Sequence, residues 1–347
     1  MKNQFLVGNI LREVRNGRLN CNNASGNSTY VKKIRRGEQT LPYASGQWQK
    51  KNLKEFAKNQ GNKISTVTSI SSKVAISEGN PYFNYDEDVM GFMIAQSAKI
   101  TDETYMGLSE LEQKLWKSMG KNKGYKRNIS AKRRSNLMLT PLQAIGHARL
   151  VDEFSTRQTD NTPLLYSKEV YASDMSVGFI LDITQVGVFK VHNNPEAYRD
   201  FSTEDVEALG LEVNDDTVRL DKETKKKRVV DTVKGLQFMP TKITMANNLE
   251  DMSAKFLIFA EYSIGNALFN NIFQDNQLRI EYLKQAIEEN EEFRLGKIYL
   301  GCRDEHFKQE GRYLADILKE EFGEDDRFIV GSVNDVINSY ISSVDVQ

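Results

Sequence analysis

Apolar and polar residues alternate in short runs along most of this chain, a pattern that indicates strands separated by polar loops and a few amphipathic helices. Residues 5–14 are rich in aliphatic side chains and predict the first strand, and the next pair, Asn16-Gly17, is typical of a hairpin turn. Residues 177–183 and 294–300 predict two more strands. Strands and helices follow one another without regular β–α–β spacing, so we expect an α+β protein rather than a doubly wound sheet.

The clearest helix signal begins at Ser45. Serine is a favoured N-cap because its hydroxyl accepts a hydrogen bond from an unpaired backbone N–H of the first turn. Trp48, Leu53 and Phe56 follow at helical spacing and define an apolar face, and we expect the helix to end before Gly61.

The remaining segments show weaker periodicity. In residues 86–95 the periodicity does not distinguish a strand from a short helix. Residues 101–127 have few aliphatic side chains and are interpreted as an insertion. The remaining expectations are a polar basic loop at 21–41, a strand-to-helix passage at 130–148, a polar hairpin at 152–167, a second hairpin over 218–233 with Lys225-Lys226-Lys227-Arg228 at its tip, and amphipathic helices at about 251–273 and 304–321.

Composition places the chain among globular proteins of the cytoplasm. Its 347 residues are 39% hydrophobic, enough for a sizeable core, and no apolar run is long enough to span a bilayer. The first residues show no signal peptide, so we expect no membrane association. Cys21 and Cys302 are the only cysteines, which excludes a disulfide framework. His147, His192 and His306 lie far apart without ligand spacing, so we expect no zinc site and no other cofactor.

Charge divides the chain into two contrasting parts. Residues 1–150 carry 25 Lys plus Arg against 11 Asp plus Glu, a surplus of 14 positive charges. The remaining 197 residues carry 22 basic and 37 acidic side chains, so the net charge of −1 hides a strongly basic segment. Clustered Lys and Arg gain free energy by releasing counterions from phosphates, which makes nucleic acid the first candidate ligand. Solvated surface charge is the alternative interpretation.

The helix from Ser45 carries the most specific basic feature. Lys50, Lys54 and Lys58 recur every four residues and therefore share one face, opposite the apolar residues. The helix N-terminus adds free N–H groups and positive dipole character, and Gly46 permits close approach of a phosphate. The full set of predicted RNA-binding residues is Lys32, Lys33, Arg35, Arg36, Ser45, Gly46, Gln47, Lys50, Lys51, Lys54, Lys132, Arg133 and Arg134.

Aromatic side chains interleave with this basic track, as in single-stranded RNA binders. Tyr30, Tyr43, Trp48 and Phe154 are available for stacking, although Trp48 fits the helix core better. The aromatic signature of RNA-recognition motifs is absent. We therefore expect contacts to the RNA backbone, and binding without sequence choice.

Asp86-Glu87-Asp88 is the one dense acidic cluster in the basic half. Carboxylates near phosphates can bind Mg²⁺ and cleave RNA, and on a strand Asp86 and Asp88 would share one face. A capping, turn or inter-subunit salt-bridge role is the favoured alternative. No other catalytic motif is visible, so we expect that the protein is not an enzyme.

The chain resembles the backbone subunit of the type I CRISPR surveillance complex, Cascade, of the RAMP superfamily, and is most similar to the type I-B version. The resemblance covers roughly residues 8–189 and weakens after about Val191. It is carried by the opening strand to Leu19-Asn20, by Ser45-Gly46-Gln47 and the lysines after it, by Tyr85 to Met93, by Lys132-Arg133-Arg134-Ser135 to Thr140-Pro141-Leu142, and by Glu169-Val170-Tyr171 to Leu181-Asp182-Ile183.

The resemblance implies one elaborated domain over residues 1–347, a modified ferredoxin-like, RNA-recognition-type palm with web and thumb insertions. It places a web-like insertion at 101–129 and a thumb-like hairpin at 152–172, with a less certain insertion bearing the basic hairpin at 191–235. Ser45, Gln47, Lys50 and Lys54 would hold guide phosphates, with Lys33, Arg35 and Arg36 nearby. The thumb residues would be Phe154, Thr156 and Arg157, which displace a base of the guide at regular intervals.

The implied function is non-catalytic. Copies would polymerise along crRNA as a helical filament and present it for pairing with target DNA. The implied partners are crRNA, target DNA, further copies of the chain and the other Cascade subunits, namely the 5′-end cap, large and small subunits. The sequence does not choose between antiviral defence and transposon targeting, in which transposition proteins would be added. Two alternatives stay open, a metal-dependent endoribonuclease of the type III backbone kind and a generic single-stranded RNA-binding module.

Overall fold

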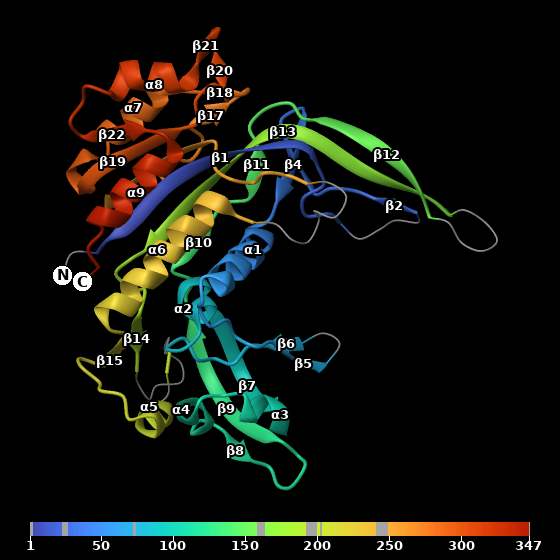
Figure 1. The fold of residues 1–347 in the computed structure, drawn as a ribbon, viewed down its shortest axis with the longest axis vertical. Helices are drawn as coiled ribbons and strands as arrows, with labels where there is room; N and C mark the ends of the chain where they lie inside the picture. The colour runs from blue at the N-terminus through green and yellow to red at the C-terminus, as the bar shows by residue number, and fades with distance from the viewer. Residues whose placement is uncertain are drawn as a thin grey trace. The chain divides into compact units, whose positions relative to one another are not determined.

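The computed structural model describes residues 3–22, 27–71, 74–157, 164–191, 200–201, 203–240 and 249–346 (Figure 1). Contacts within the chain divide it into two units. Unit 1 consists of Met1–Phe56, Met138–Asp182 and Thr232–Asp345, and unit 2 consists of Ala57–Leu137, Ile183–Asp231 and Val346–Gln347.

Unit 1 is built on an 11-stranded sheet with the order β22-β19-β16-β1-β13-β11-β4-β3, and β2, β10 and β12 pair with β13 off this path. Its strands are β1 (Phe5–Gly17), β2 (Ser28–Thr29), β3 (Lys33–Arg36), β4 (Gln39–Ala44), β10 (Leu137–Leu139), β11 (Leu142–Ala144), β12 (Arg149–Arg157), β13 (Leu164–Asp182), β16 (Phe256–Tyr262), β19 (Arg294–Cys302) and β22 (Phe328–Gly331). Two short hairpins accompany it, β17 (Phe273–Gln274) with β18 (Gln277–Leu278) and β20 (Lys308–Gln309) with β21 (Arg312–Tyr313).

β1 is an inner strand of this sheet, between β13 and β16, and it pairs with both in antiparallel register. Gly8 faces Phe179 across one pair and Phe259 across the other. A Cβ at Gly8 would lie 2.5 Å from the Phe179 ring and 2.6 Å from the Ile258 carbonyl oxygen. Only glycine leaves room for these neighbours, so the close packing of the three strands at this position depends on Gly8.

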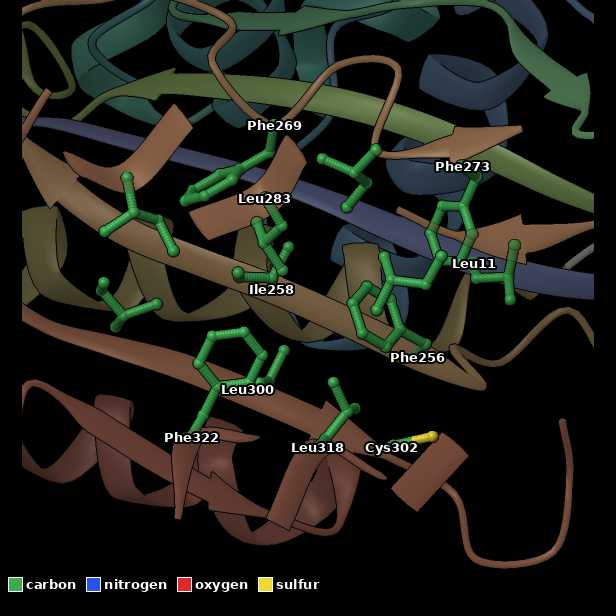
Figure 2. Close-up of a cluster of buried hydrophobic side chains, with 14 of the residues drawn as sticks. Leu11, Phe256, Ile258, Phe269, Phe273, Leu283, Leu300, Cys302, Leu318 and Phe322 are labelled. Atoms are coloured by element: carbon green, nitrogen blue, oxygen red, sulfur yellow. The ribbon is translucent and has the colours of Figure 1, made fainter. Parts of the chain in front are cut away.

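Helices cover both faces of the sheet in unit 1. On one face, α7 (Ile280–Glu288) and α8 (Leu314–Phe322) bury Leu283, Leu318 and Phe322 against strand residues such as Ile258 and Leu300, as Figure 2 shows. On the other face, α9 (Val333–Ser343) places Tyr340 against the rings of Phe259 and Tyr299. η1 (Glu291–Phe293) also belongs to unit 1, whereas α1 (Gly46–Asn59) and α6 (Lys222–Phe238) have residues in both units, with the divisions after Phe56 and after Asp231.

Arg12 fixes the end of α6 within unit 1. Its side chain is fully buried and donates hydrogen bonds to the backbone carbonyls of Leu236 and Met252, and to that of Gln237 at 3.4 Å. Burial lowers the pKa of Arg12 to about 9, although Asp251 opposes this effect. The guanidinium thus satisfies carbonyls that a helix C-terminus leaves without partners.

Unit 2 contains a three-stranded antiparallel sheet with β9 between β7 and β8, and a core around Phe189, Phe201 and Trp116. Its strands are β5 (Thr68–Ser71), β6 (Val74–Ile76), β7 (Phe92–Ile100), β8 (Lys117–Ser118), β9 (Tyr125–Arg133), β14 (Val188–Lys190) and β15 (Thr217–Arg219). Its short helices are α2 (Tyr85–Met90), α3 (Asp102–Met106), α4 (Glu110–Gln113) and α5 (Thr203–Leu209).

The α+β prediction is confirmed, and several local predictions hold with it. The strands expected at 5–14, 177–183 and 294–300 correspond to β1, the end of β13 and β19, and the helix after Ser45 is α1. Residues 86–95 contain both candidate structures, since α2 gives way to β7 at Gly91. The polar hairpin at 152–167 corresponds to the antiparallel pair β12 and β13, and residues 158–163 lie outside the described residues.

Other local predictions were wrong for identifiable reasons. The expected helix at 251–273 contains β16, whose run Phe256–Tyr262 is apolar because both sheet faces are covered. The expected basic hairpin at 218–233 is largely helix α6. Residues 222–233 are rich in Lys and contain no Gly or Pro, a composition that favours a helix. Strands β10 and β11 replace the expected helix within 130–148, and β1 continues through Asn16-Gly17 without turning.

The basic segment expected as a loop at 21–41 also has regular structure in its described part. β3 and β4 form a hairpin that turns at Gly37, which has a φ of 60°. Residues 23–26 of that segment, and residues 192–199 with His192, lie outside the described residues.

Candidate nucleic-acid interface

The N-terminus of α1 is the first part of the candidate interface in unit 1. Ser45 caps the helix as its sequence predicts, because its Oγ accepts a hydrogen bond from the Trp48 N–H at 3.3 Å. The Ser45 N–H donates to the Asn20 side-chain oxygen at 2.8 Å, which ties the cap to the chain after β1. Sequence reasoning did not identify Asn20, which has a positive φ of 46°, as a residue that supports the cap.

The basic face of α1 follows directly from this cap. Gln47 and Lys51 are exposed, while Lys50 and Lys54 are half-buried. The opposite side packs into unit 1, where Leu53 is buried and Phe56 stacks on Phe238. The predicted division of the helix into an apolar face and a basic face is therefore present.

Lys50 is electrostatically unusual. Burial, with a smaller contribution from the charge of Lys54, lowers the pKa of Lys50 to about 8. Two ammonium groups at i and i+4 repel each other, and a phosphate placed between them would relieve that repulsion.

The β3–β4 hairpin holds the second group of basic residues in unit 1. Arg35 and Arg36 are exposed, and the Arg35 Nε donates to the Gly37 carbonyl at 3.2 Å. Lys33 forms an ion pair with Glu169 at 2.6 Å and lies 5.7 Å from the Tyr30 ring centroid. Lys32 is half-buried. Arg35 and Arg36 therefore present charge to solvent more directly than Lys33 does.

A polar cleft of about 640 Å³ adjoins this hairpin within unit 1. Arg36 and Gln39 line one part of it, and Gln143 and Asn270 line others. Two other lining residues are hydrogen-bonded to each other, since the Ser176 hydroxyl donates to the Asn9 Oδ1 at 2.7 Å. Arg36 is one of the predicted RNA-binding residues, whereas sequence reasoning missed Gln39, Gln143 and Asn270 because strands far apart in the chain bring them together.

The β12–β13 hairpin carries the residues expected in the thumb. Phe154 pairs with Ser167 and Thr156 pairs with Leu165, so all four share one face of the hairpin. The side chain of Phe154 is 79% exposed and that of Leu165 is 63% exposed. The side chain of Arg157 lies outside the described residues.

The third predicted basic cluster belongs to unit 2, and its three residues differ from one another. Arg134 is exposed and Lys132 is half-buried. Arg133 is buried at the end of β9, where it forms ion pairs with Asp88 at 2.5 Å and Asp200 at 2.8 Å. Because its guanidinium is occupied by these carboxylates, we leave Arg133 out of the proposed RNA-contacting set.

The acidic cluster Asp86-Glu87-Asp88 is internal to unit 2, on the short helix α2. All three side chains are at most 1% exposed. Asp86 accepts hydrogen bonds from the backbone N–H and hydroxyl of Ser65, at 2.8 and 2.7 Å. Asp88 binds both Arg133 and Arg228, the latter at 2.6 Å. These carboxylates are therefore committed to structural partners, as the salt-bridge alternative expected, although within one chain.

Glu87, the third carboxylate of this cluster, is also hydrogen-bonded within unit 2. It accepts hydrogen bonds from the Gly79 and Asn80 N–H groups at 2.6 and 2.5 Å and from the Asn84 amide. Burial raises the pKa of Glu87, and these donors oppose the shift. Among the described residues, no group of three or more His, Cys, Asp or Glu side chains is arranged to hold a metal ion.

Comparisons with known proteins identify the fold. No family model matches the sequence, and no curated protein matches it either. Among solved structures, a chain of a "CRISPR RNA-guided surveillance complex" matches with a TM-score of 0.52 and 10% identity, covering 98% of this chain and 99% of that one. A chain of a "CRISPR RNA-guided surveillance complex, pre-nicking" matches with a TM-score of 0.48 and 9% identity, covering 98% and 99%. The first of these shares the α+β fold over nearly its whole length. In the described part of the chain, no helix is long and apolar enough to cross a bilayer.

Proposed function

We propose that this protein is a non-catalytic guide-RNA-binding backbone subunit of a type I, I-B-like, Cascade complex of the RAMP superfamily. The observation that carries the proposal is the Ser45-capped helix, which presents Gln47, Lys50, Lys51 and Lys54 on the side opposite its apolar face. The end-to-end match of fold with a chain of a "CRISPR RNA-guided surveillance complex" supports it.

In this proposal the RNA backbone, rather than its bases, is held by unit 1. The helix N-terminus and the lysines after it supply charge without base-specific donors and acceptors, which predicts sequence-neutral binding. Lys32, Lys33, Arg35 and Arg36 would extend the track along the β3–β4 hairpin. The exposed Phe154 and Thr156 suit the thumb role of wedging against a base or a neighbouring copy.

The proposed assembly has copies of the chain in contact with one another through an interface that repeats and does not close into a ring. Copies would stack along crRNA as a helical filament and present it to target DNA, with the 5′-end cap, large and small subunits completing the cytoplasmic complex. The buried, partnered state of Asp86, Glu87 and Asp88 supports a non-catalytic role over the endoribonuclease alternative. Transposition proteins would be further partners if the complex directs insertion rather than antiviral defence.

The deciding experiment follows the mass of the nucleic-acid-free protein by sizing chromatography with light scattering, as single-stranded RNAs of increasing length are added with Mg²⁺. A backbone subunit gives mass that rises in equal steps with RNA length and leaves the RNA intact. One bound copy at every RNA length would instead establish a generic RNA-binding module. Shortened RNA would establish a nuclease.

A further inference from the structure

Two buried carboxylates of unit 2 share one amide group. The Asn84 Nδ2 donates to Glu78 Oε2 at 2.9 Å and to Glu87 Oε2 at 3.0 Å. Glu78 is 8% exposed and Glu87 is 1% exposed. Because both hydrogen bonds start from one nitrogen, the two carboxylates lie close together in the interior. Two buried negative charges this close repel each other and have lost their hydration, so they need a compensating charge.

The groups that bind these carboxylates are neutral. Glu78 accepts a hydrogen bond from the Thr66 N–H at 2.9 Å, and Glu87 accepts from the Gly79 and Asn80 N–H groups at 2.6 and 2.5 Å. In the described part of the chain, neither carboxylate forms an ion pair. Neutral donors stabilise a carboxylate but leave its charge in place.

The arginines next to this loop pair with other carboxylates. Arg127 donates to the Glu78 backbone carbonyl at 3.0 Å, and its guanidinium forms an ion pair with Asp205 at 2.7 Å. Arg228 forms an ion pair with Asp88 at 2.6 Å. A proton could remove one negative charge instead. However, both oxygens of Glu87 accept N–H hydrogen bonds, and such bonds favour the ionised form.

Two buried amide oxygens in the same loop have no hydrogen-bond partner among the described residues. They are Asn80 Oδ1 and Asn84 Oδ1, on residues that are 3% and 0% exposed. An amide nitrogen that donates to two acceptors uses both of its hydrogens, and one of these lies on the carbonyl side of the amide. Asn84 Oδ1 therefore lies beside a carboxylate. Asn80 adjoins both groups, because its N–H donates to Glu87 and its backbone carbonyl accepts from the Asn84 N–H at 3.0 Å.

These oxygens together indicate a missing positive charge rather than a missing donor. Buried acceptors without partners cost free energy, and so do buried charges without partners. One cation among the two carboxylates and the two amide oxygens would satisfy both requirements at once. With only two carboxylates, this set differs from the groups of three or more His, Cys, Asp or Glu side chains, none of which occurs among the described residues.

We propose that Glu78, Asn80, Asn84 and Glu87 bind a buried divalent cation, Ca²⁺ in preference to Mg²⁺. All of the ligand atoms are carboxylate or amide oxygens, the donors that Ca²⁺ takes. Mg²⁺ usually keeps several of its waters, and side chains at most 8% exposed leave little space for a hydration shell. The buried ion holds residues 78–84 against α2 and does not act on RNA.

This inference goes beyond the proposed function and does not depend on it. The full chain is first treated with EGTA, and its thermal unfolding is then followed in CaCl₂ or MgCl₂. Tb³⁺ replaces Ca²⁺ in a second measurement, with luminescence excited through Tyr85, which follows Asn84 in the chain. The variants are Asn80→Ala and Glu78→Gln. The control, Glu103→Gln with Glu110→Gln, removes two exposed carboxylates from the same unit.

Ca²⁺ at about 100 times its Kd should raise the unfolding temperature of the wild type by about 5 to 10 °C, and equal Mg²⁺ should raise it less. Asn80→Ala should bind Tb³⁺ at least tenfold more weakly. In EGTA this variant should unfold at the wild-type temperature, because the oxygen that it loses has no partner among the described residues. It thus tests the site even if Glu78→Gln fails to fold. The control should keep the wild-type response to Ca²⁺.

Three outcomes would overturn the proposal. The first is a wild type that neither gains stability in Ca²⁺ nor sensitises Tb³⁺, which would leave a buried water or a proton in place of the cation. The second is an equal response of the wild type and Asn80→Ala, which would place the ion elsewhere. The third is a loss of the response in the control, which would assign it to surface carboxylates. Mass that fails to rise in steps with RNA length would refute the backbone function alone.

Discussion

Arg133 and Asp88 form a buried ion pair of 2.5 Å that joins the end of β9 to α2 in unit 2. Arg133 also donates to the Asp88 and Val188 carbonyls, at 3.0 and 2.9 Å. Asp88 additionally binds Arg228 of α6 at 2.6 Å. One carboxylate thus joins segments that are far apart in sequence, and a nucleic-acid role for Arg133 would require breaking this network.

We therefore expect Arg133→Gln to destabilise the protein rather than weaken RNA binding selectively. The substitution takes the arginine partner away from the buried Asp200 and one of two arginine partners away from Asp88. Breaking a buried ion pair in this way should cost about 3–5 kcal/mol in the free energy of unfolding. Denaturant unfolding measures it. Arg15→Gln is the control, because the Arg15–Glu13 pair is exposed and should leave stability unchanged. An Arg133→Gln variant of wild-type stability with reduced RNA affinity would return this residue to the RNA-binding set.

Removing the basic face of α1 should weaken RNA binding equally for all sequences. Lys50→Ala with Lys54→Ala should lower the dependence of log K on log salt by about 1 to 2, from roughly 0.7 to 0.9 per lost phosphate contact. Titrations with several RNA sequences at several salt concentrations measure this slope. Lys308→Ala with Lys319→Ala removes equal charge elsewhere in unit 1 and should leave the slope unchanged. An unaltered slope in the α1 variant would remove this helix from the RNA track.

The lowered pKa of Lys50 predicts a pH dependence of RNA affinity. The ammonium form attracts phosphate and the neutral amine does not, and with a pKa of about 8 the charged fraction falls as pH rises through that value. Affinity should therefore decrease from about pH 7 to about pH 9 in the wild type. Lys50→Arg keeps its charge over this range, so its affinity should vary less. Identical pH profiles would show that Lys50 does not contact the RNA.

Phe154 offers a test of the thumb that stability does not confound. Its ring is 79% exposed, so Phe154→Ala should leave the unfolding temperature unchanged. If the ring helps to displace a base, guide RNAs that carry 2-aminopurine at successive positions should fluoresce strongly at regularly spaced positions when bound to the wild type. The fluorescence at those positions should be weaker with the variant. Val213→Ala, an exposed apolar control in unit 2, should retain the wild-type pattern. Uniform fluorescence with the wild-type protein would contradict base displacement.

Some of the candidate interface could be predicted from the sequence because it depends on local order. The cap at Ser45 and the two faces of α1 follow from helix periodicity, which needs no distant contact. The strand character of β1 and β19 was equally visible as aliphatic patterning. The fold class followed from the irregular order of these elements.

Only the tertiary structure decided which charged side chains are exposed and which are buried in ion pairs. Arg133 and Arg134 are neighbours in sequence, yet Arg133 is the last residue of β9 and is buried against Asp88, whereas Arg134 follows the strand and is exposed. Arg228 in the basic run of α6 is likewise buried, and its partner Asp88 lies 140 positions earlier in the chain, a contact that local sequence does not reveal. The sequence by itself determined the α+β class, the capped basic helix and the uneven charge, whereas long-range packing determined which of those charges hold the fold together and which face solvent.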